Sequence, residues 1–191
     1  NTIQDAINAA QANQNEIIFV QEGTYNESVI INKSGLIIRG PNAGNNPNGG
    51  ASVTPAIVQP PNAQVAFTFD PNQTINNVTI EGLTIRTNNE NGIRMQATTG
   101  GENILIRRNV FTGPGEGDSG TIYMDLNPTS SVVSVRENVL RDITNNISSG
   151  IQIIDARTVT VLDNVLSNIV GPGMALDNLT GTGTQISRIS N

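Results

Sequence analysis

Three aspartates close short apolar runs in the second half of the sequence. The runs read YMD, IID and ALD and end at Asp125, Asp155 and Asp177, with Gln96 in the equivalent place one run earlier. If the runs are stacked strands, the three carboxylates lie about 4.8 Å apart. Carboxylates that close raise the pKa of at least one member, which suits acid–base catalysis, or they recruit Ca²⁺. The alternative is that each Asp ends a strand by bonding the turn backbone and facing water.

The same residues suggest a reaction on an acidic sugar polymer. One aspartate would supply the nucleophile or base, and Arg94 or Arg157 would bind the anionic group of the substrate. Two further acids, Glu116 and Asp118, lie in the loop GPGEGDSG and indicate either a calcium loop or a plain turn. The chain has no His and no Cys, which excludes an imidazole base, a thiol nucleophile, a thiolate metal site and disulfides.

The elements that would position these side chains form a repeat. Four segments share one apolar pattern: 78–86 (VTIEGLTIR), 104–112, 133–141 and 159–167. One predicted column contains Ile80, Ile106, Val135 and Val161, and another contains Ile85, Phe111, Leu140 and Leu166. A second strand is expected after each segment, at 91–95, 120–124, 150–154 and 172–176. A period in the twenties with turns between strands predicts coils that stack in parallel and share one core.

Asparagine recurs in one register of this repeat. Asn109, Asn138 and Asn164 stand before Val in NVF or NVL, at spacings of 29 and 26 residues, and Asn191 follows after 27 more. An inward Asn at a turn would bond the Asn of the next coil, because a buried amide is costly unless it is paired. We therefore predict a structural ladder, with contact to a ligand as the alternative. The first aligned segment has Leu83 instead, so the ladder would begin at Asn109.

The first residues of the chain predict a helix that covers the N-terminal end of the stacked coils. Ile3, Ala6, Ile7 and Ala10 share one helical face, and Thr2 precedes Asp5 by three residues, which predicts a capping box. We expect a helix over 2–12. Residues 41–56 carry Pro, Gly and Asn without periodicity and predict a surface loop within a single domain, 1–191.

The opening segment resembles a known superfamily. TIQDAINAA followed by EIIFVQEGTYNESVIINKSGLIIRG is similar to the start of pectin-lyase-like, right-handed parallel β-helices, in which a helix precedes a G-x-Y-x-E segment; here Gly23, Tyr25 and Glu27 match. The resemblance implies the fold and leaves the activity open, since the superfamily includes lyases, hydrolases, esterases, epimerases and non-catalytic surface proteins. The catalytic blocks of pectin methylesterases, pectate lyases and polygalacturonases are absent from this sequence.

The composition of the chain limits the classes of partner that it is expected to bind. The net charge is −6 with a single lysine, Lys33, which argues against nucleic acid, and no apolar run approaches the length of a membrane span. The chain has 27 Asn and six N-x-S/T sequons, at Asn26, Asn32, Asn72, Asn77, Asn146 and Asn178. Acidity without cysteine fits a secreted protein, although it also fits many cytoplasmic ones.

We therefore expect an all-β, right-handed parallel β-helix of about six coils with a short N-terminal capping helix. The expected role is an extracellular or cell-surface module with a structural, adhesive or assembly function, which binds polysaccharide or further copies of itself. The alternative is a polysaccharide lyase or carbohydrate esterase that uses the aspartates. No cofactor is expected apart from Ca²⁺ at Asp125, Asp155 and Asp177. The segment TGTGTQISRISN has no capping helix, which predicts either continuation into more coils or end-to-end association through the C-terminal coil.

Overall fold

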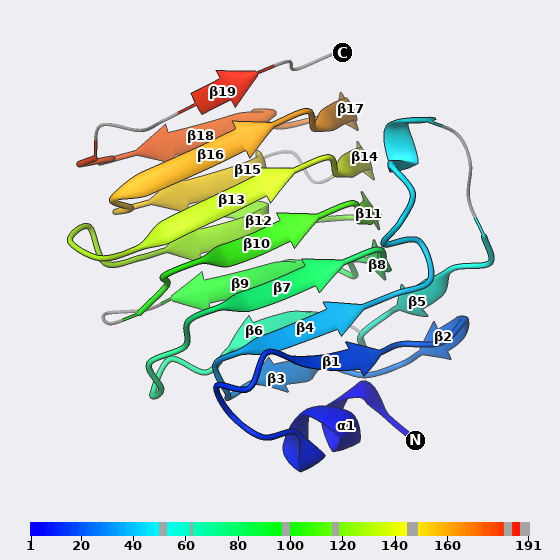
Figure 1. The fold of residues 1–191 in the computed structure, drawn as a ribbon. Helices are drawn as coiled ribbons and strands as arrows, with labels where there is room; N and C mark the ends of the chain where they lie inside the picture. Colours follow the sequence, from blue (N-terminus) through cyan, green and yellow to red (C-terminus); the bar gives the residue numbers. More distant parts are fainter. Residues whose placement is uncertain are drawn as a thin grey trace.

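The chain coils into a parallel β-helix built from three sheets (Figure 1). The computed structural model describes residues 1–49, 53–61, 63–96, 100–115, 119–144, 149–181 and 185–187. Sheet A contains β1 (Glu16–Phe19), β4 (Leu36–Arg39), β7 (Val78–Glu81), β10 (Ile104–Arg107), β13 (Val132–Arg136), β16 (Thr158–Leu162) and β19 (Gln185–Ser187). Sheet B contains β2 (Gly23–Tyr25), β5 (Ala56–Val58), β8 (Thr84–Arg86), β11 (Val110–Thr112), β14 (Val139–Ile143) and β17 (Val165–Ile169). Sheet C contains β3 (Val29–Ile31), β6 (Phe67–Phe69), β9 (Ile93–Gln96), β12 (Gly120–Asp125), β15 (Ser149–Ile154) and β18 (Met174–Asp177).

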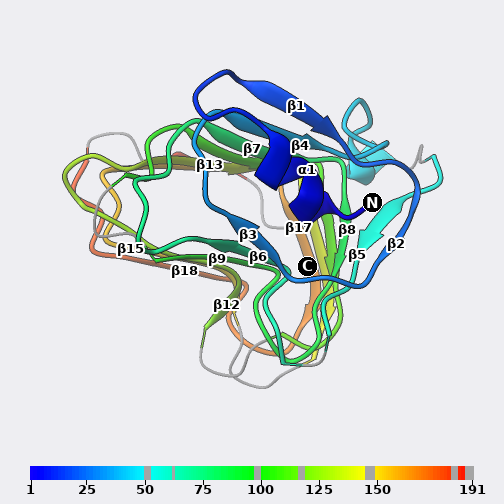
Figure 2. The same ribbon diagram turned by 90° about the horizontal axis from the view of Figure 1, so that it is seen from below.

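The chain visits sheets A, B and C in turn, and one such pass is called a rung below. Seen from the N-terminal end, the path from β1 through β2 to β3 runs clockwise and away from the viewer, which makes the coil right-handed (Figure 2). Sheet A has seven strands and the other two have six, so the coil count differs slightly from the predicted six because β19 begins a further pass.

The predicted inward columns are confirmed. On sheet A the residue partners join Ile80 to Ile106, Ile106 to Val135 and Val135 to Val161. On sheet B they join Ile85, Phe111, Leu140 and Leu166 in the same way. Apolar side chains at alternate positions set this register, because a slip of one residue would turn every inward side chain toward solvent.

A short helix covers the first rung, as the sequence predicted, but it is shorter than 2–12. Helix α1 spans Ile3–Ala9 and buries Ile3 and Ile7 over the core (Figure 2). Thr2 and Asp5 form the predicted capping box. The helix ends early because Ala10 is extended, and the Lys33 ammonium binds the freed carbonyls of Ile7, Asn8 and Ala10 at 3.0, 2.7 and 2.7 Å.

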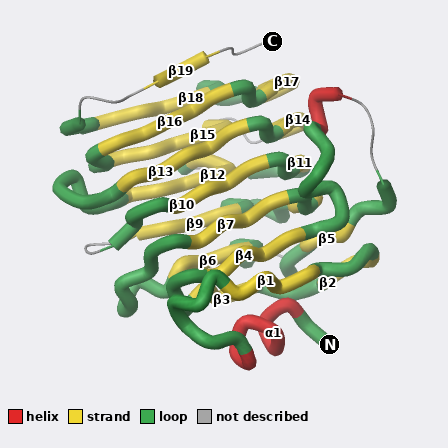
Figure 3. The backbone as a smooth tube through the Cα atoms, viewed as in Figure 1, coloured by secondary structure: helices red, strands yellow, loops and turns green. Residues whose placement is uncertain are grey.

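The loop after β4 climbs along the solenoid instead of crossing directly to β5 (Figures 1 and 3). It contains the 3₁₀ turn η1 (Pro47–Gly49), and the Asn48 side-chain amide donates to the Asp163 carbonyl, 115 residues away, at 2.8 Å. The Asn42 side chain bonds both the N–H and the carbonyl of Val53, which holds the two arms of the loop together. The predicted loop of 41–56 ends one residue earlier, since Ala56 begins β5. Residues 41–49 and 53–55 are called the wall loop below.

No helix among the described residues has both the length and the apolar character needed to span a membrane.

Candidate anion-binding groove

The bend from sheet A to sheet B uses the same two-residue turn in successive rungs. Its first residue has a positive φ, at Gly82 (70°), Arg108 (55°), Glu137 (56°) and Asp163 (54°). The left-handed conformation turns the chain sharply and points this residue outward. The second residue of the turn then points into the core, where it is Leu83 or an Asn.

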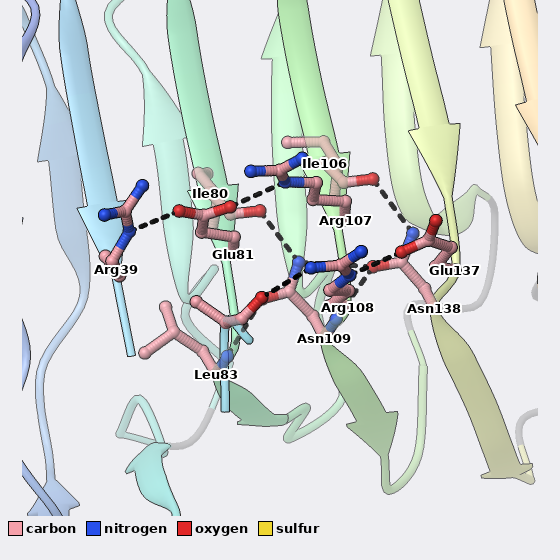
Figure 4. A network of polar contacts seen from close by, with 11 residues as sticks. Arg39, Ile80, Glu81, Leu83, Ile106, Arg107, Arg108, Asn109, Glu137 and Asn138 are labelled. Atoms are coloured by element: carbon pink, nitrogen blue, oxygen red, sulfur yellow. Dashed lines mark hydrogen bonds and ion pairs between the residues drawn. The ribbon is translucent and has the colours of Figure 1, made fainter. Parts of the chain in front are cut away.

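Inside the bend, three asparagines form a continuous ladder (Figure 4). The Oδ1 atom of Asn138 accepts from the backbone N–H and the Nδ2 group of Asn109, at 3.0 and 3.2 Å. Asn164 accepts in the same way from the N–H and Nδ2 of Asn138, at 3.0 and 2.9 Å. At the lower end, the Leu83 N–H donates to Asn109 Oδ1 at 3.1 Å. The predicted fourth member, Asn191, lies outside the described residues.

Each ladder amide also bonds the sheet A strand of the rung below it. The Nδ2 donors and their acceptors are Asn109 with the Ile80 carbonyl at 2.9 Å, Asn138 with Ile106 at 3.0 Å and Asn164 with Val135 at 2.8 Å. These asparagines are at most 3% exposed. The protein itself supplies hydrogen-bond partners for the polar atoms of these side chains. The asparagine column therefore has a structural role and leaves no side-chain group free to bind a ligand.

Outside the bend, a buried carboxylate holds two arginines (Figure 4). Glu81 is only 1% exposed, and its two oxygens accept from Arg39 Nε at 2.5 Å and from Arg107 Nε at 2.6 Å. All three residues are register partners on neighbouring strands of sheet A. Two guanidinium groups therefore pair with one carboxylate, and the column of these three residues keeps a net positive charge.

Arg108 joins the bend to the wall loop. Its Nε donates to Glu137 Oε2 at 2.5 Å, and its Nη1 donates to the Ala43 carbonyl at 2.9 Å. The wall loop passes so close to Gly82 that a Cβ atom there would lie 2.1 Å from the Ala43 nitrogen. Only glycine fits beneath the loop at this point, since its positive φ would strain other residues as well.

A groove of about 360 Å³ lies between the wall loop and the outer face of sheet B. Its wall comes from Asn42, Asn45, Pro47 and Pro55, and its floor from Ile57, Thr84, Val110 and Val139. Three arginines line it: Arg86 and Arg141, which are exposed, and Arg108 at the bend. Neither Arg86 nor Arg141 has an ion-pair partner in the described part of the chain. We call this space the arginine groove.

The arginine groove continues past Arg86. This side chain also lines a second hollow of about 390 Å³, together with Gln59, Asn88 and Thr112. Arg86 Nη1 donates to Gln59 Oε1 at 3.4 Å, which is a weak hydrogen bond. The combined path offers guanidinium groups and amides above an apolar floor, an arrangement that suits a chain of sugars bearing anions.

The three aspartates predicted as a column are not in one register. Asp125 and Asp177 are each the partner of Ile154, and Asp155 lies one residue beyond. The inward pair Ile122 and Met124 faces Ile151 and Ile153, and this apolar match sets the register. Alignment on the aspartates would have opposed Ile122 to Gln152 and turned one strand inside out.

Asp155 and Asp177 both bond to Asn178 in the turn after β18. Asp155 has a positive φ of 55° and accepts from the side-chain amide of Asn178, and the Asn178 N–H donates to Asp177 Oδ1 at 2.8 Å. Within the described residues, no three acidic side chains gather where they could hold a metal ion. The structure therefore does not assemble the predicted Ca²⁺ site, and Glu116 and Asp118 lie outside the described residues.

Asp125 and Arg94 both lie next to Tyr123 on sheet C. Tyr123 lies beside Arg94 in register on the outer face of sheet C, and Asp125 and Gln96 are partners at the next outward position. Partial burial raises the pKa of Tyr123, the Asp125 carboxylate adds to the rise, and a hydrogen bond with Gln96 and the charge of Arg94 oppose it. Arg94 is held by Asn91 Oδ1 at 2.7 Å and by Glu90 at 3.0 Å. Arg157 is exposed on the turn before β16, away from this cluster.

The arginines of the groove were not predicted as a site from the sequence. Arg86 and Arg141 stand two residues after Thr84 and Val139, and alternation along the strands was a signal that both point outward. The wall loop was not predictable, because nothing in its composition indicates that it reaches the turn before β17.

Comparison with protein families, with curated proteins and with solved structures finds no match to this chain.

Proposed function

We propose that this protein is an extracellular or cell-surface module that binds an acidic polysaccharide in the arginine groove. The observation that carries the proposal is the group of three arginines along one apolar floor in a protein whose net charge is −6. Of ten basic residues in the chain, six lie on sheets A and B or at the bend between them: Arg39, Arg86, Arg107, Arg108, Arg136 and Arg141. We also propose that the fold belongs to the pectin-lyase-like superfamily, on the strength of the helix and the G-x-Y-x-E segment.

The chemistry of the groove favours a carboxylate- or sulfate-bearing sugar. A guanidinium presents parallel N–H donors that match the two oxygens of such a group. The side chains of Ile57, Val110 and Val139 offer apolar contact to the C–H faces of sugar rings. The groove crosses several rungs, so neighbouring sugars of one chain would meet successive arginines.

Binding to polygalacturonate, with neutral dextran as the comparison polymer, tests this proposal by calorimetry. Replacement of Arg141 by Ser should weaken polygalacturonate binding about tenfold, the effect of losing one charge-assisted hydrogen bond. Arg86→Ser should also weaken binding about tenfold. Both losses of affinity should be smaller at high salt, because ionic screening weakens the attraction between the replaced arginine and the polymer.

Arg157→Ser is the matched control, because it removes an exposed arginine that does not line the groove. It should leave the affinity within twofold of the native value. Equal loss in the Arg141 and Arg157 variants would mean that net charge alone governs binding, and a loss only at Arg157 would favour the role that the sequence analysis gave it. Dextran binding as tight as polygalacturonate binding would contradict the proposal.

A second function, cleavage of the same polymer, is favoured by the Arg94–Tyr123–Asp125 cluster. In this arrangement Arg94 would bind the substrate carboxylate, Asp125 would take the proton from C5 of the sugar, and Tyr123, which keeps its proton, would donate it to the leaving glycosidic oxygen as the C4–O bond breaks and the C4–C5 double bond forms. Release of new reducing ends from polygalacturonate would show the activity, and Asp125→Asn and Tyr123→Phe should abolish it. No release by the native protein at any pH tested would leave binding as the function.

Self-association through the C-terminal coil, the other partner predicted from the sequence, stays a prediction. Light scattering over a range of protein concentrations measures it. A mass that rises with concentration would support end-to-end assembly, and a constant monomer mass would contradict it.

A further inference from the structure

Besides the unpaired arginines of the groove on sheet B, the outer face of sheet A carries Arg136, which has no ion-pair partner among the described residues. Arg136 follows Arg107 in the column that begins with Arg39 and Glu81, and the two arginines are register partners on neighbouring strands. Like charges opposite each other on a sheet repel, so such a pair normally has an anion nearby. Glu81 serves Arg39 and Arg107. Among the described residues, no carboxylate pairs with Arg136.

The second observation concerns one nitrogen of the Arg136 side chain. Its Nε atom is shielded from solvent and has no hydrogen-bond partner. A buried N–H without an acceptor is costly and is rare in folded proteins, so a turn of the Arg136 side chain that brings Nε to an acceptor in the trough would be favourable. The neighbouring Glu137 is already paired with Arg108.

Arg136 also lines an open space. A trough of about 420 Å³ runs over β4, β7, β10 and β13, with Ile37 and Leu105 in its floor and Asn77 and Asn103 at the edge opposite Arg136. Asn103 Nδ2 donates to Asn77 Oδ1 at 2.9 Å, so these amides form an ordered edge. The trough therefore resembles the arginine groove, with amides on one side, the guanidinium group of Arg136 on the other and apolar side chains between them.

We propose that the sheet A trough is a second anion site, in which Arg136, beside the positive charge of Arg107, binds a carboxylate of an acidic polysaccharide, and that one molecule bridges two polymer chains. Sheets A and B form different sides of the coil (Figure 2), and the bend between them carries the Arg108–Glu137 pair (Figure 4) and the bond from Arg108 to the wall loop. Two chains can therefore bind at once. The bridging part of the inference rests on the function proposed for the arginine groove, but the second site does not.

Calorimetric titration with trigalacturonate counts the sites. The native protein should bind two molecules, Arg136→Ser should bind one, and the double variant Arg86→Ser, Arg141→Ser should bind one. Arg136→Lys keeps the charge without the Nε donor and should bind at the second site at least fivefold more weakly than the native protein. A single site in the native protein that Arg136→Ser leaves intact would overturn the proposal.

Side-chain NMR gives a readout that a structural role of Arg136 would not produce. The Arg136 Nε–H resonance should shift on addition of trigalacturonate, and it should still shift in the Arg86→Ser, Arg141→Ser variant. No shift in either protein would contradict the second site. A shift in the native protein together with loss of the groove site in calorimetry would keep this inference while removing the proposed function of the groove.

Bridging is measured with the polymer itself. The native protein should raise the light scattering of a polygalacturonate solution, and Arg136→Ser should bind the polymer while leaving its scattering unchanged. Strong scattering by Arg136→Ser would show that one site per molecule is enough, which would overturn bridging.

Discussion

The third rung and the rungs above it make the same bend from sheet A to sheet B with different residues. In the third rung the outward position is Gly82 and the inward position is Leu83, whereas in the second rung the chain after Gly40 continues into the wall loop. In the upper rungs the outward positions are charged and the inward ones are the asparagines of the ladder. The lower glycines lie beneath the wall loop or against the next turn, where a Cβ would clash, whereas the upper bends have room for side chains.

The comparison explains why the ladder begins at Asn109. An Asn ladder needs a backbone N–H below each member to donate to its Oδ1 atom. Arg39 and Glu81 are register partners, and the second residue after each is Pro41 and Leu83. Proline has no N–H, so an Asn in place of Leu83 would find no donor below it. The leucine fills the core instead, and its own N–H closes the ladder from beneath.

The largest effect should come from breaking the ladder. Asn138→Leu removes the acceptor for the Asn109 N–H and the donor for the Ile106 carbonyl, both buried. We expect a loss of about 3 kcal/mol in the free energy of unfolding, measured by urea denaturation. Arg141→Ser, at an exposed position on the outer face of the same rung, should change it by less than about 0.5 kcal/mol. Equal losses in the two variants would contradict a structural ladder.

The next effect should come from trying to extend the ladder downward. Leu83→Asn buries an amide that has no donor below it and removes an apolar side chain that is only 2% exposed. We expect a loss of about 2 kcal/mol in the same denaturation experiment. An unchanged or higher stability would show that the lower bend can accept an Asn and that Pro41 does not limit the ladder.

A smaller effect should follow from filling the space under the wall loop. Gly82→Ala places a methyl group against Ala43 at a residue with φ of 70°, which should cost about 1–2 kcal/mol in strain and displace the loop. The same variant should weaken polygalacturonate binding, since the loop forms one side of the groove. Gly44→Ala is the control, because a Cβ there meets no atom within 4 Å. Equal binding by both variants would show that the wall is dispensable.

The smallest effect concerns a residue away from the bend. Burial and Asp125 raise the pKa of Tyr123 above its ordinary value of 10.0, so the folded state keeps the phenol proton where the unfolded state loses it. This contribution to stability is present below pH about 10 and is lost as the pH rises through the folded pKa. Tyr123→Phe should flatten the fall in melting temperature at alkaline pH, and identical slopes for both proteins would contradict the raised pKa.

The sequence predicted what depends on alternation and missed what depends on long-range packing. The columns at Ile80 and Ile85 were predictable because β-branched and apolar residues alternate inside turns of constant length. Asp155 was misaligned because a visible acid at a strand end has less influence on register than the apolar residues that precede it. The arginine groove needed the path of the wall loop, and an aperiodic segment rich in Asn, Gly and Pro carries no signal for that path.

The bond from Asn48 to Asp163 changes how this array should come apart. In a solenoid each repeat touches only its neighbours, so the end rungs can fray one at a time in a nearly one-dimensional manner. Here a loop that leaves after β4 reaches the turn before β17, and its contact spans 115 residues of the chain. Fraying of the sixth rung therefore also removes a contact of the wall loop in the second rung, so that loss of structure at the upper end is felt near the lower end of the array.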